Sequence, residues 1–201
     1  SLRRAKARVV QGAIGRVQRL RCWGWAPRPD KYYQRNDWAG RTRRGDAWVL
    51  DGPMNNALAH QTAAMLYLAS DRPRTFATPS AVRAELYHAR DIEGHDTFAA
   101  EIRTAEGPVT TFAGTHCPAS SGHEGPWIVV EGTEGRIDWR QGGPLRVETP
   151  SGRLEDLESD PCHPMEQALV GFTAAVRAGD PELLACDLGM GRNYTLAING
   201  A

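Results

Sequence analysis

Between residues 97 and 149 the sequence alternates short runs of strand-forming residues with tight turns, and this pattern constrains the fold more than any other feature. The segments AEGP, GTEG and QGGP mark the turns, because glycine and proline favour a sharp change of chain direction. Strands joined by turns this short must be antiparallel neighbours. The sequence predicts strands near residues 81–90, 97–104, 109–115, 127–131, 136–139 and 145–149.

Helical patterns flank these strands. The pattern predicts helices over residues 2–11 with Gly12 or Gly15 at the end, over 53–69, over 164–178 with Gly179 at the end, and from about 181 onward, while residues 17–28 have strand character. The order helix, strand, loop, helix, sheet, helix predicts an α+β fold. We expect a mostly antiparallel open sheet of about six strands with helices packed on one face, forming a single domain over residues 1–201.

Composition and charge narrow the class of protein. The chain is 41% hydrophobic and 24% charged, and it has no apolar run of the roughly 18 residues that a membrane span needs. Its four cysteines form no CxxC pair, so we expect them to be reduced residues that pack in the fold. We therefore expect a cytoplasmic protein without a metal site. Residues 1–50 carry 13 Lys or Arg against 3 Asp or Glu. Without a stacking motif or a zinc finger, this basic segment favours a solvated face or a surface docked on another protein domain over nucleic-acid binding.

Several catalytic motifs are absent or fail. The segment GMGRNY, at 189–194, has a tyrosine at the third glycine position of a dinucleotide-binding fingerprint and follows no predicted strand. A GxSxG elbow and a Walker loop do not occur. The side chains of His116, Cys117, His123 and His163 lack the spacing of metal ligands on a regular element.

The stretch DGPMNNALAHQ, which begins at Asp51, concentrates polar groups at the start of a predicted helix. On a helix, Asn56 and His60 would lie on one stripe. One interpretation is structural, with asparagine satisfying first-turn amides and His60 a hydrogen-bonded core residue. The other is a binding site for a hydroxylated small molecule, in which histidine moves a proton near neutral pH. The candidate site residues are Tyr33, Arg35, Asn36, Trp38, Asp51, Asn55, Asn56 and His60.

Four segments, YYQRNDWAGR, WVLDGPMNNALAHQ, ELYHARDIEGHDT and HPMEQALVGFTAAVRAGDPE, together resemble the C-terminal domain of the Gfo/Idh/MocA family of NAD(P)-dependent sugar and polyol oxidoreductases. The resemblance runs from about residue 2 to the end and implies a fold of the glyceraldehyde-3-phosphate-dehydrogenase C-terminal type. It also implies a homo-oligomer formed through the sheet, and an N-terminal Rossmann domain that binds NAD or NADP and supplies a catalytic lysine in a Glu-Lys-Pro motif.

The same resemblance assigns roles to the polar stretch. Many family members place an aspartate and a histidine four residues apart on the first helix after a strand, and His60 matches that histidine. Asn56 stands where the acid would be and cannot exchange a proton, although it can hydrogen-bond a substrate hydroxyl. The implied substrate is a sugar, a sugar acid or a polyol, with Tyr33, Arg35, Asp51, Asn55 and Asn56 orienting it and Trp38 walling the pocket.

Two other functions remain open. The chain has no glycine-rich fingerprint and no Glu-Lys-Pro motif, so we expect a fragment whose cofactor domain lies elsewhere and which is inactive alone. A non-catalytic binding or dimerisation module of the same fold is one alternative. An NAD-assisted glycosidase domain, known in a branch of the family, is another.

Overall fold

A computed structural model describes residues 2–119, 127–140, 143–158 and 164–201. Its centre is an eight-stranded sheet with the order β10-β9-β8-β7-β1-β6-β5-β4. Every neighbouring pair is antiparallel except β1 and β6, which run parallel. The strands are β1 (Val17–Trp25), β4 (Pro79–Tyr87), β5 (Thr97–Thr104), β6 (Val109–Thr115), β7 (Trp127–Gly132), β8 (Arg136–Arg140), β9 (Leu145–Glu148) and β10 (Leu154–Leu157).

The expected α+β class and mostly antiparallel sheet are confirmed, while the expected number of strands was too low. The sheet has eight strands instead of about six. The sequence pattern did not predict β10, and the strand expected within residues 17–28 is β1, which belongs to the same sheet. β10 has the sequence LEDL, in which two of four residues are acidic, and it forms the sheet edge beside β9.

Alternation of buried and exposed residues places the core on one face of the sheet. In β5, Phe98, Ala100 and Ile102 are buried, and the Phe98 ring meets Phe112 of β6 edge to face with centroids 4.8 Å apart. Such an aromatic pair contributes beyond the area that it buries. Gly114 of β6 lies where a β-carbon would approach the Phe98 ring and Leu58 closer than 3 Å, so glycine is required for this packing.

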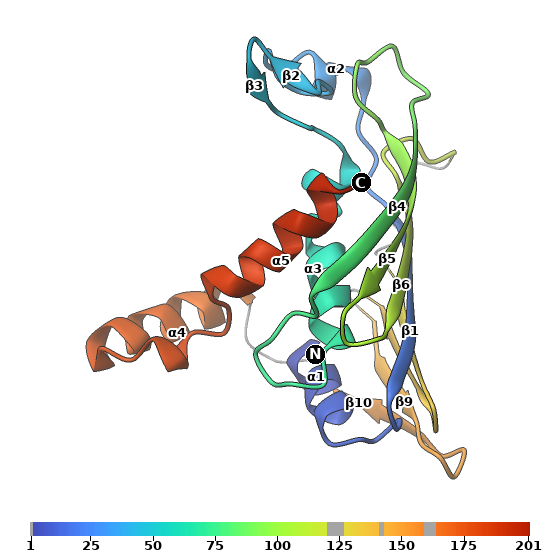
Figure 1. The fold of residues 1–201 in the computed structure, drawn as a ribbon, viewed down its shortest axis with the longest axis vertical. Coiled ribbons are helices and arrows are strands. Elements are labelled where there is room, and N and C mark those ends of the chain that lie inside the picture. The colour runs from blue at the N-terminus through green and yellow to red at the C-terminus, as the bar shows by residue number, and fades with distance from the viewer. Residues whose placement is uncertain (1, 120–126, 141–142, 159–163) are drawn as a thin grey trace.

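Helices cover that inner face, as Figure 1 shows. They are α1 (Leu2–Val10), α3 (Ala59–Ala69) and α5 (Leu188–Asn199). α3 packs against β1 and β6 of the sheet as well as against α1 and α5. Lys6 of α1 is buried and donates hydrogen bonds from its ammonium to the carbonyls of Tyr67 and Ser70 at the end of α3. Cations are favourable at a helix C-terminus, so this contact joins the two helices.

The opposite face of the sheet is open and carries ion pairs. Glu131 of β7 accepts from Arg19 and Arg21 of β1, which neutralises part of the basic charge of residues 1–50. The rings of Trp23 and Trp127 lie 5.3 Å apart on the same two strands. The open face is therefore a charged surface with an aromatic pair, which is less apolar than a typical obligate interface.

The segment between β1 and α3 contains more regular structure than the expected loop. It includes α2 (Asp30–Tyr33) and a small hairpin formed by β2 (Arg43–Arg44) and β3 (Ala47–Trp48). The expected helix over residues 53–69 is divided into η1 (Pro53–Asn55) and α3, which begins at Ala59. Asn56 lies between them with φ −126° and ψ −110°, so it does not share a helical stripe with His60.

The C-terminal helices agree with the sequence pattern in part. α4 (Pro164–Ala178) has the expected bounds and ends at Gly179, whose φ is +63°. The expected last helix from about 181 consists of η2 (Pro181–Leu183) followed by α5. Figure 1 shows α4 projecting from the body of the domain, on the side that the helices occupy.

Candidate functional site

A hydrogen-bonded group joins Asp51, Asn56 and Tyr32 at the end of the segment that precedes α3. Asp51 is 6% exposed, and one of its carboxylate oxygens accepts from the Gly40 amide at 2.7 Å. Its other oxygen accepts from Nδ2 of Asn56 at 3.2 Å. The same Nδ2 donates to the phenolic oxygen of Tyr32. The Asn56 amide is thus oriented from two sides.

Tyr32 also contacts Arg35, which in turn contacts Trp38. Arg35 donates to the Tyr32 hydroxyl at 3.0 Å, and its guanidinium lies 3.9 Å from the centroid of the same ring. The Arg35 guanidinium is also 4.9 Å from the centroid of Trp38. Cations stacked on aromatic faces are stabilised by the ring quadrupole. The structure therefore brings Arg35, Trp38, Asp51 and Asn56 together around Tyr32.

His60 lies on the second position of α3 and is exposed. A core histidine, the structural alternative for this residue, is therefore wrong. An exposed imidazole at the start of a helix is accessible to a ligand.

Two of the candidate asparagines stabilise turns. Oδ1 of Asn36 accepts from the amides of Trp38 at 3.2 Å and Ala39 at 2.8 Å. Nδ2 of Asn55 donates to the carbonyl of Leu50 at 2.6 Å, and Leu50 has a φ of +51°. Such local side-chain bonds are typical of asparagine in turns. The structure gives the side chains of these two residues backbone partners.

Tyr33 faces a different partner from Tyr32. Its hydroxyl is 3.1 Å from Nδ1 of His116, which lies just after β6 and is 2% exposed. Burial, followed by the positive charge of Arg28, lowers the pKa of His116 to about 4. Burial raises the pKa of Tyr33. Both groups are therefore neutral at physiological pH, and no spacing between them in the sequence indicates that they pair.

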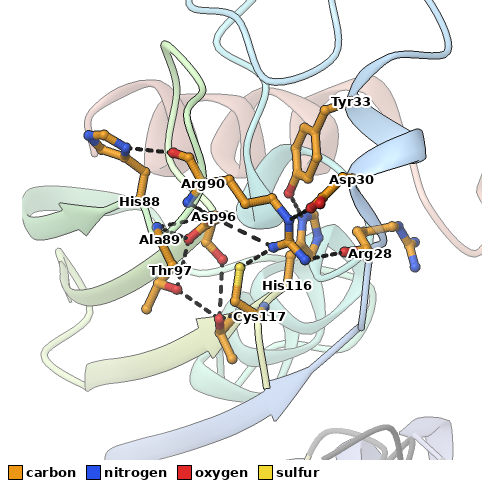
Figure 2. Close-up of polar contacts among 11 residues, drawn as sticks. Arg28, Asp30, Tyr33, His88, Ala89, Arg90, Asp96, Thr97, His116 and Cys117 are labelled. Carbon is orange, nitrogen blue, oxygen red and sulfur yellow. Dashed lines mark hydrogen bonds and ion pairs between the residues drawn. The ribbon is translucent and has the colours of Figure 1, made fainter. Parts of the chain in front are cut away.

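Asp96, the residue before β5, organises the cluster drawn in Figure 2. It is fully buried and accepts from the amides of Ala89 and Arg90 at 3.1 Å. Burial raises the pKa of Asp96, but hydrogen bonds from Cys117 and from these amides outweigh it, so the pKa is lowered overall. Buried carboxylates persist when they are paired in this way.

Arg90 connects the cluster to the chain around α2. It pairs with Asp30 at 2.7 Å, donates to the carbonyl of Arg28 at 2.7 Å, and contacts the sulfur of Cys117. Burial and the hydrogen bond with Asp96 raise the pKa of Cys117 to about 11. Cys117 is therefore a protonated thiol, without the thiolate character of a nucleophile.

A cavity of about 970 Å³ opens beside this cluster, between residues 30–41 and 89–93. Tyr33 and Asn36 from the candidate set line it, together with Arg41, Arg90 and Glu93. A cavity of this size accommodates a small organic molecule, and its polar lining suits a hydroxylated one. Asn56 and His60 are not among its lining residues, so the candidate set divides between the cavity and the Asn56 group.

No group of three or more His, Cys, Asp or Glu side chains is arranged for a metal ion in the described ranges. Of the four residues considered for metal binding, His123 and His163 lie outside these ranges. Cys22, Cys117 and Cys186 are free thiols, and Cys162 is also outside the described residues. In the described part of the chain, no helix is long and apolar enough to cross a membrane.

A family model described as the GFO/IDH/MocA C-terminal domain matches residues 2–138. The chain belongs to this family. The resemblance expected from the four sequence segments is therefore confirmed. GMGRNY lies within α5, so this GFO/IDH/MocA domain has no phosphate loop at that segment. No curated protein matches the chain.

Solved structures share the fold. The chain is similar to an oxidoreductase from Agrobacterium radiobacter in complex with NAD+, L-tartaric acid and magnesium, with 15% identity and a TM-score of 0.70, over 100% of this chain and 59% of that one. It is similar to UDP-N-acetylglucosamine 3-dehydrogenase GnnA from Acidithiobacillus ferrooxidans, with 16% identity and a TM-score of 0.73, over 98% and 57%. It is also similar to the WlbA dehydrogenase from Bordetella pertussis in complex with NADH and UDP-GlcNAcA, with 23% identity and a TM-score of 0.70, over 100% and 55%. The chain thus spans less than two thirds of these proteins.

Proposed function

We propose that this chain is the substrate-binding domain of an NAD(P)-dependent oxidoreductase that acts on a sugar, a sugar acid or a polyol. The observation that carries the proposal is the Asn56 amide, held between Asp51 and Tyr32 shortly before the exposed His60. An oriented amide and an accessible imidazole suit a substrate hydroxyl that must be positioned and deprotonated. Family membership and the NAD-bound relatives support the same reaction class.

In this proposal His60 accepts or relays the hydroxyl proton of the substrate. The carbonyl oxygen of the Asn56 side chain is the group available to a substrate hydroxyl, because Nδ2 already donates to Tyr32 and Asp51. Arg35 and Trp38 form the wall beyond Tyr32. Proton transfer by a positioned side chain contributes roughly 10²- to 10⁴-fold in rate.

The cavity next to Tyr33 and Asn36 is proposed to receive the part of the substrate distant from the reacting carbon. Its lining carries three carboxylates, from Asp30, Asp91 and Glu93, against the guanidiniums of Arg41 and Arg90. Arg90 is already paired with Asp30. Hydroxyl groups can bond to both signs of charge, so this lining favours an uncharged polyhydroxylated group.

In this proposal, the cofactor is bound mainly by residues outside this chain. The described residues contain no glycine-rich loop between a strand and a helix, which is the element that binds a dinucleotide pyrophosphate. In an enzyme of this class the nicotinamide, NAD or NADP, exchanges a hydride with the substrate carbon. The residues of this chain bind the substrate and hold its hydroxyl proton.

We also propose a homo-oligomer formed through the open face of the sheet. The Trp23–Trp127 pair and a shallow hollow over β1, β4, β5 and β6 are features that a second copy could fill. The ion pairs of Glu131 with Arg19 and Arg21 make this face suited to a polar contact. Light scattering on Trp127→Glu tests it, since a smaller assembly is expected.

A non-catalytic binding module is the second candidate, and Asn56 favours it because an amide cannot exchange a proton. The deciding experiment is turnover by the complete polypeptide that carries this chain and an NAD-binding domain, with a panel of sugars, sugar acids and polyols. Cofactor reduction with one substrate class supports the oxidoreductase. Saturable sugar binding without any cofactor reduction supports the module. Release of a glycoside's aglycone would instead indicate glycosidase activity.

A further inference from the structure

Helix α4 exposes large apolar side chains that its own chain leaves uncovered. Leu169, Phe172 and Val176, here called the α4 stripe, are between 59% and 65% exposed. They fall at i, i+3 and i+7, which is the spacing of residues that pack together on one helix face. A helix at a protein surface normally packs its apolar face against the core. The exposed α4 stripe therefore indicates a missing partner.

The described part of the chain offers little to cover this stripe. α4 makes its most extensive contacts with η2, and Ala175 is buried. Figure 1 shows the helix standing clear of the sheet and of α3. Large apolar side chains are also exposed after α4 in the chain, since Leu183 of η2 is 49% exposed and Leu188 at the start of α5 is 93% exposed.

α4 and η2, here called the projecting arm, are held in place at their base. Arg74 donates to the carbonyls of Pro181 and Glu182 and pairs with the Glu182 carboxylate at 3.2 Å. In α5, Asn193 donates to the carbonyl of Phe76 at 3.2 Å, and Met190 is buried. The α4 stripe is therefore presented in a defined direction.

We propose that the α4 stripe docks against the NAD(P)-binding domain of the same enzyme, an inference that rests on the proposed function. The relatives with this fold are longer, since the chain spans 55% to 59% of the three described above. Figure 1 places α1 and α4 on the same side of the sheet. A domain joined to α1 would lie on that side, where α4 offers apolar surface.

A second copy of this chain is the competing occupant, and the structure supports it less. The open sheet face, proposed above for self-association, lies opposite the helices, so a copy bound there leaves α4 uncovered. A partner docked at α4 would also be connected to the candidate site, through α5. The hydroxyl of Tyr194 in α5 donates to the carbonyl of Met54 at 3.2 Å, within the short helix that leads to Asn55 and Asn56.

Hydrogen exchange of the α4 amides tests the proposal in the 201-residue chain and in the complete polypeptide with its NAD-binding domain. We expect exchange of the α4 amides to be at least about 100-fold slower in the complete polypeptide, because packing an exposed helix suppresses its local opening. The double variant Leu169→Glu/Phe172→Glu should abolish this protection. Arg177→Gln, on the same helix, is the matched control and should retain it.

The melting temperature of the 201-residue chain should be the same with and without the double variant, since both side chains are exposed there. Equal α4 exchange in the two polypeptides would overturn the proposal. So would a dimer of the 201-residue chain that dissociates in the double variant, because a second copy would then be the occupant. Exchange is measured without substrate, so a protected α4 in a polypeptide that turns over no sugar would refute the proposed function and leave the interface standing.

Discussion

The side-chain amide of Asn56 donates a hydrogen bond to the phenolic oxygen of Tyr32, and the two residues are 24 positions apart in the sequence. This contact closes the long segment between β1 and α3 onto the turn before α3. The same amide donates to Asp51, so the group depends on the donor character of Asn56.

Replacing Asn56 with aspartate should destabilise the domain in a pH-dependent way. The new carboxylate would stand beside Asp51, and like charges raise the pKa of one member of such a pair. A raised folded pKa makes the penalty, about 2 kcal/mol, present at pH 7 and smaller as the pH falls toward ~4. Urea denaturation of Asn56→Asp at both pH values measures it, with Asn56→Ala as the uncharged control. A penalty that is equal at the two pH values would contradict this account.

Substitution of the two adjacent tyrosines should separate their roles. Tyr32→Phe removes the acceptor of the Asn56 amide, and losing one hydrogen bond of this kind corresponds to a roughly tenfold rise in KM. Tyr33→Phe removes the contact with His116 instead, so it should lower the melting temperature more than it changes KM. Steady-state kinetics and thermal unfolding of both variants in the complete enzyme test the assignment. The reverse pattern would place the reacting end of the substrate next to Tyr33 instead of Tyr32.

His60→Ala should depress turnover without changing stability. The imidazole is exposed, so its removal leaves no cavity in the core. Loss of a proton-transfer group should lower kcat by roughly 10²- to 10⁴-fold. The melting temperature of the variant should match that of the unmodified chain, and unchanged turnover would remove His60 from the mechanism.

Acid should destabilise the domain through His116. Its folded pKa of about 4 lies below the ordinary value of 6.5. Between these two pH values the unfolded chain therefore binds a proton at this residue and the folded chain does not. Stability should therefore fall as the pH drops from about 6.5 to about 4, by up to roughly 3 kcal/mol. Urea titrations across this range should show a shallower slope in His116→Gln. An unchanged slope in His116→Gln would contradict this account.

The sequence predicted the fold where the pattern is local. Alternation in residues 97–115 and the bounds of α4 agree with the structure, because each pattern spans a whole element. The start of α3 was misplaced, since Pro53 suits the first turn of a 3₁₀ helix as well as that of an α-helix. The backbone of Asn56, which breaks the helix, leaves no mark in the residue types around it.

The candidate site was predictable as a region but not as a set of contacts. The segment from Tyr32 to His60 supplies the Asn56 group, as the density of polar and aromatic residues indicated. The choice between Tyr32 and Tyr33 was not accessible, because successive residues of a helical turn point about 100° apart. Asp96, Arg90 and His116 are separated from this segment in sequence, and they reach it through pairing between strands.

The place of β1 in the sheet determines when this domain can fold. β1 precedes seven of the strands in sequence and yet lies between β6 and β7, and its partners in β6 are each 90 positions later. Pairings this distant close long loops before they gain stability, so folding is slow. During synthesis, β1 has both edges unpaired until the ribosome has released its two neighbours. The first strand of this sheet to emerge is therefore the one most exposed to wrong pairing, and chaperone binding during translation is expected at residues 17–25.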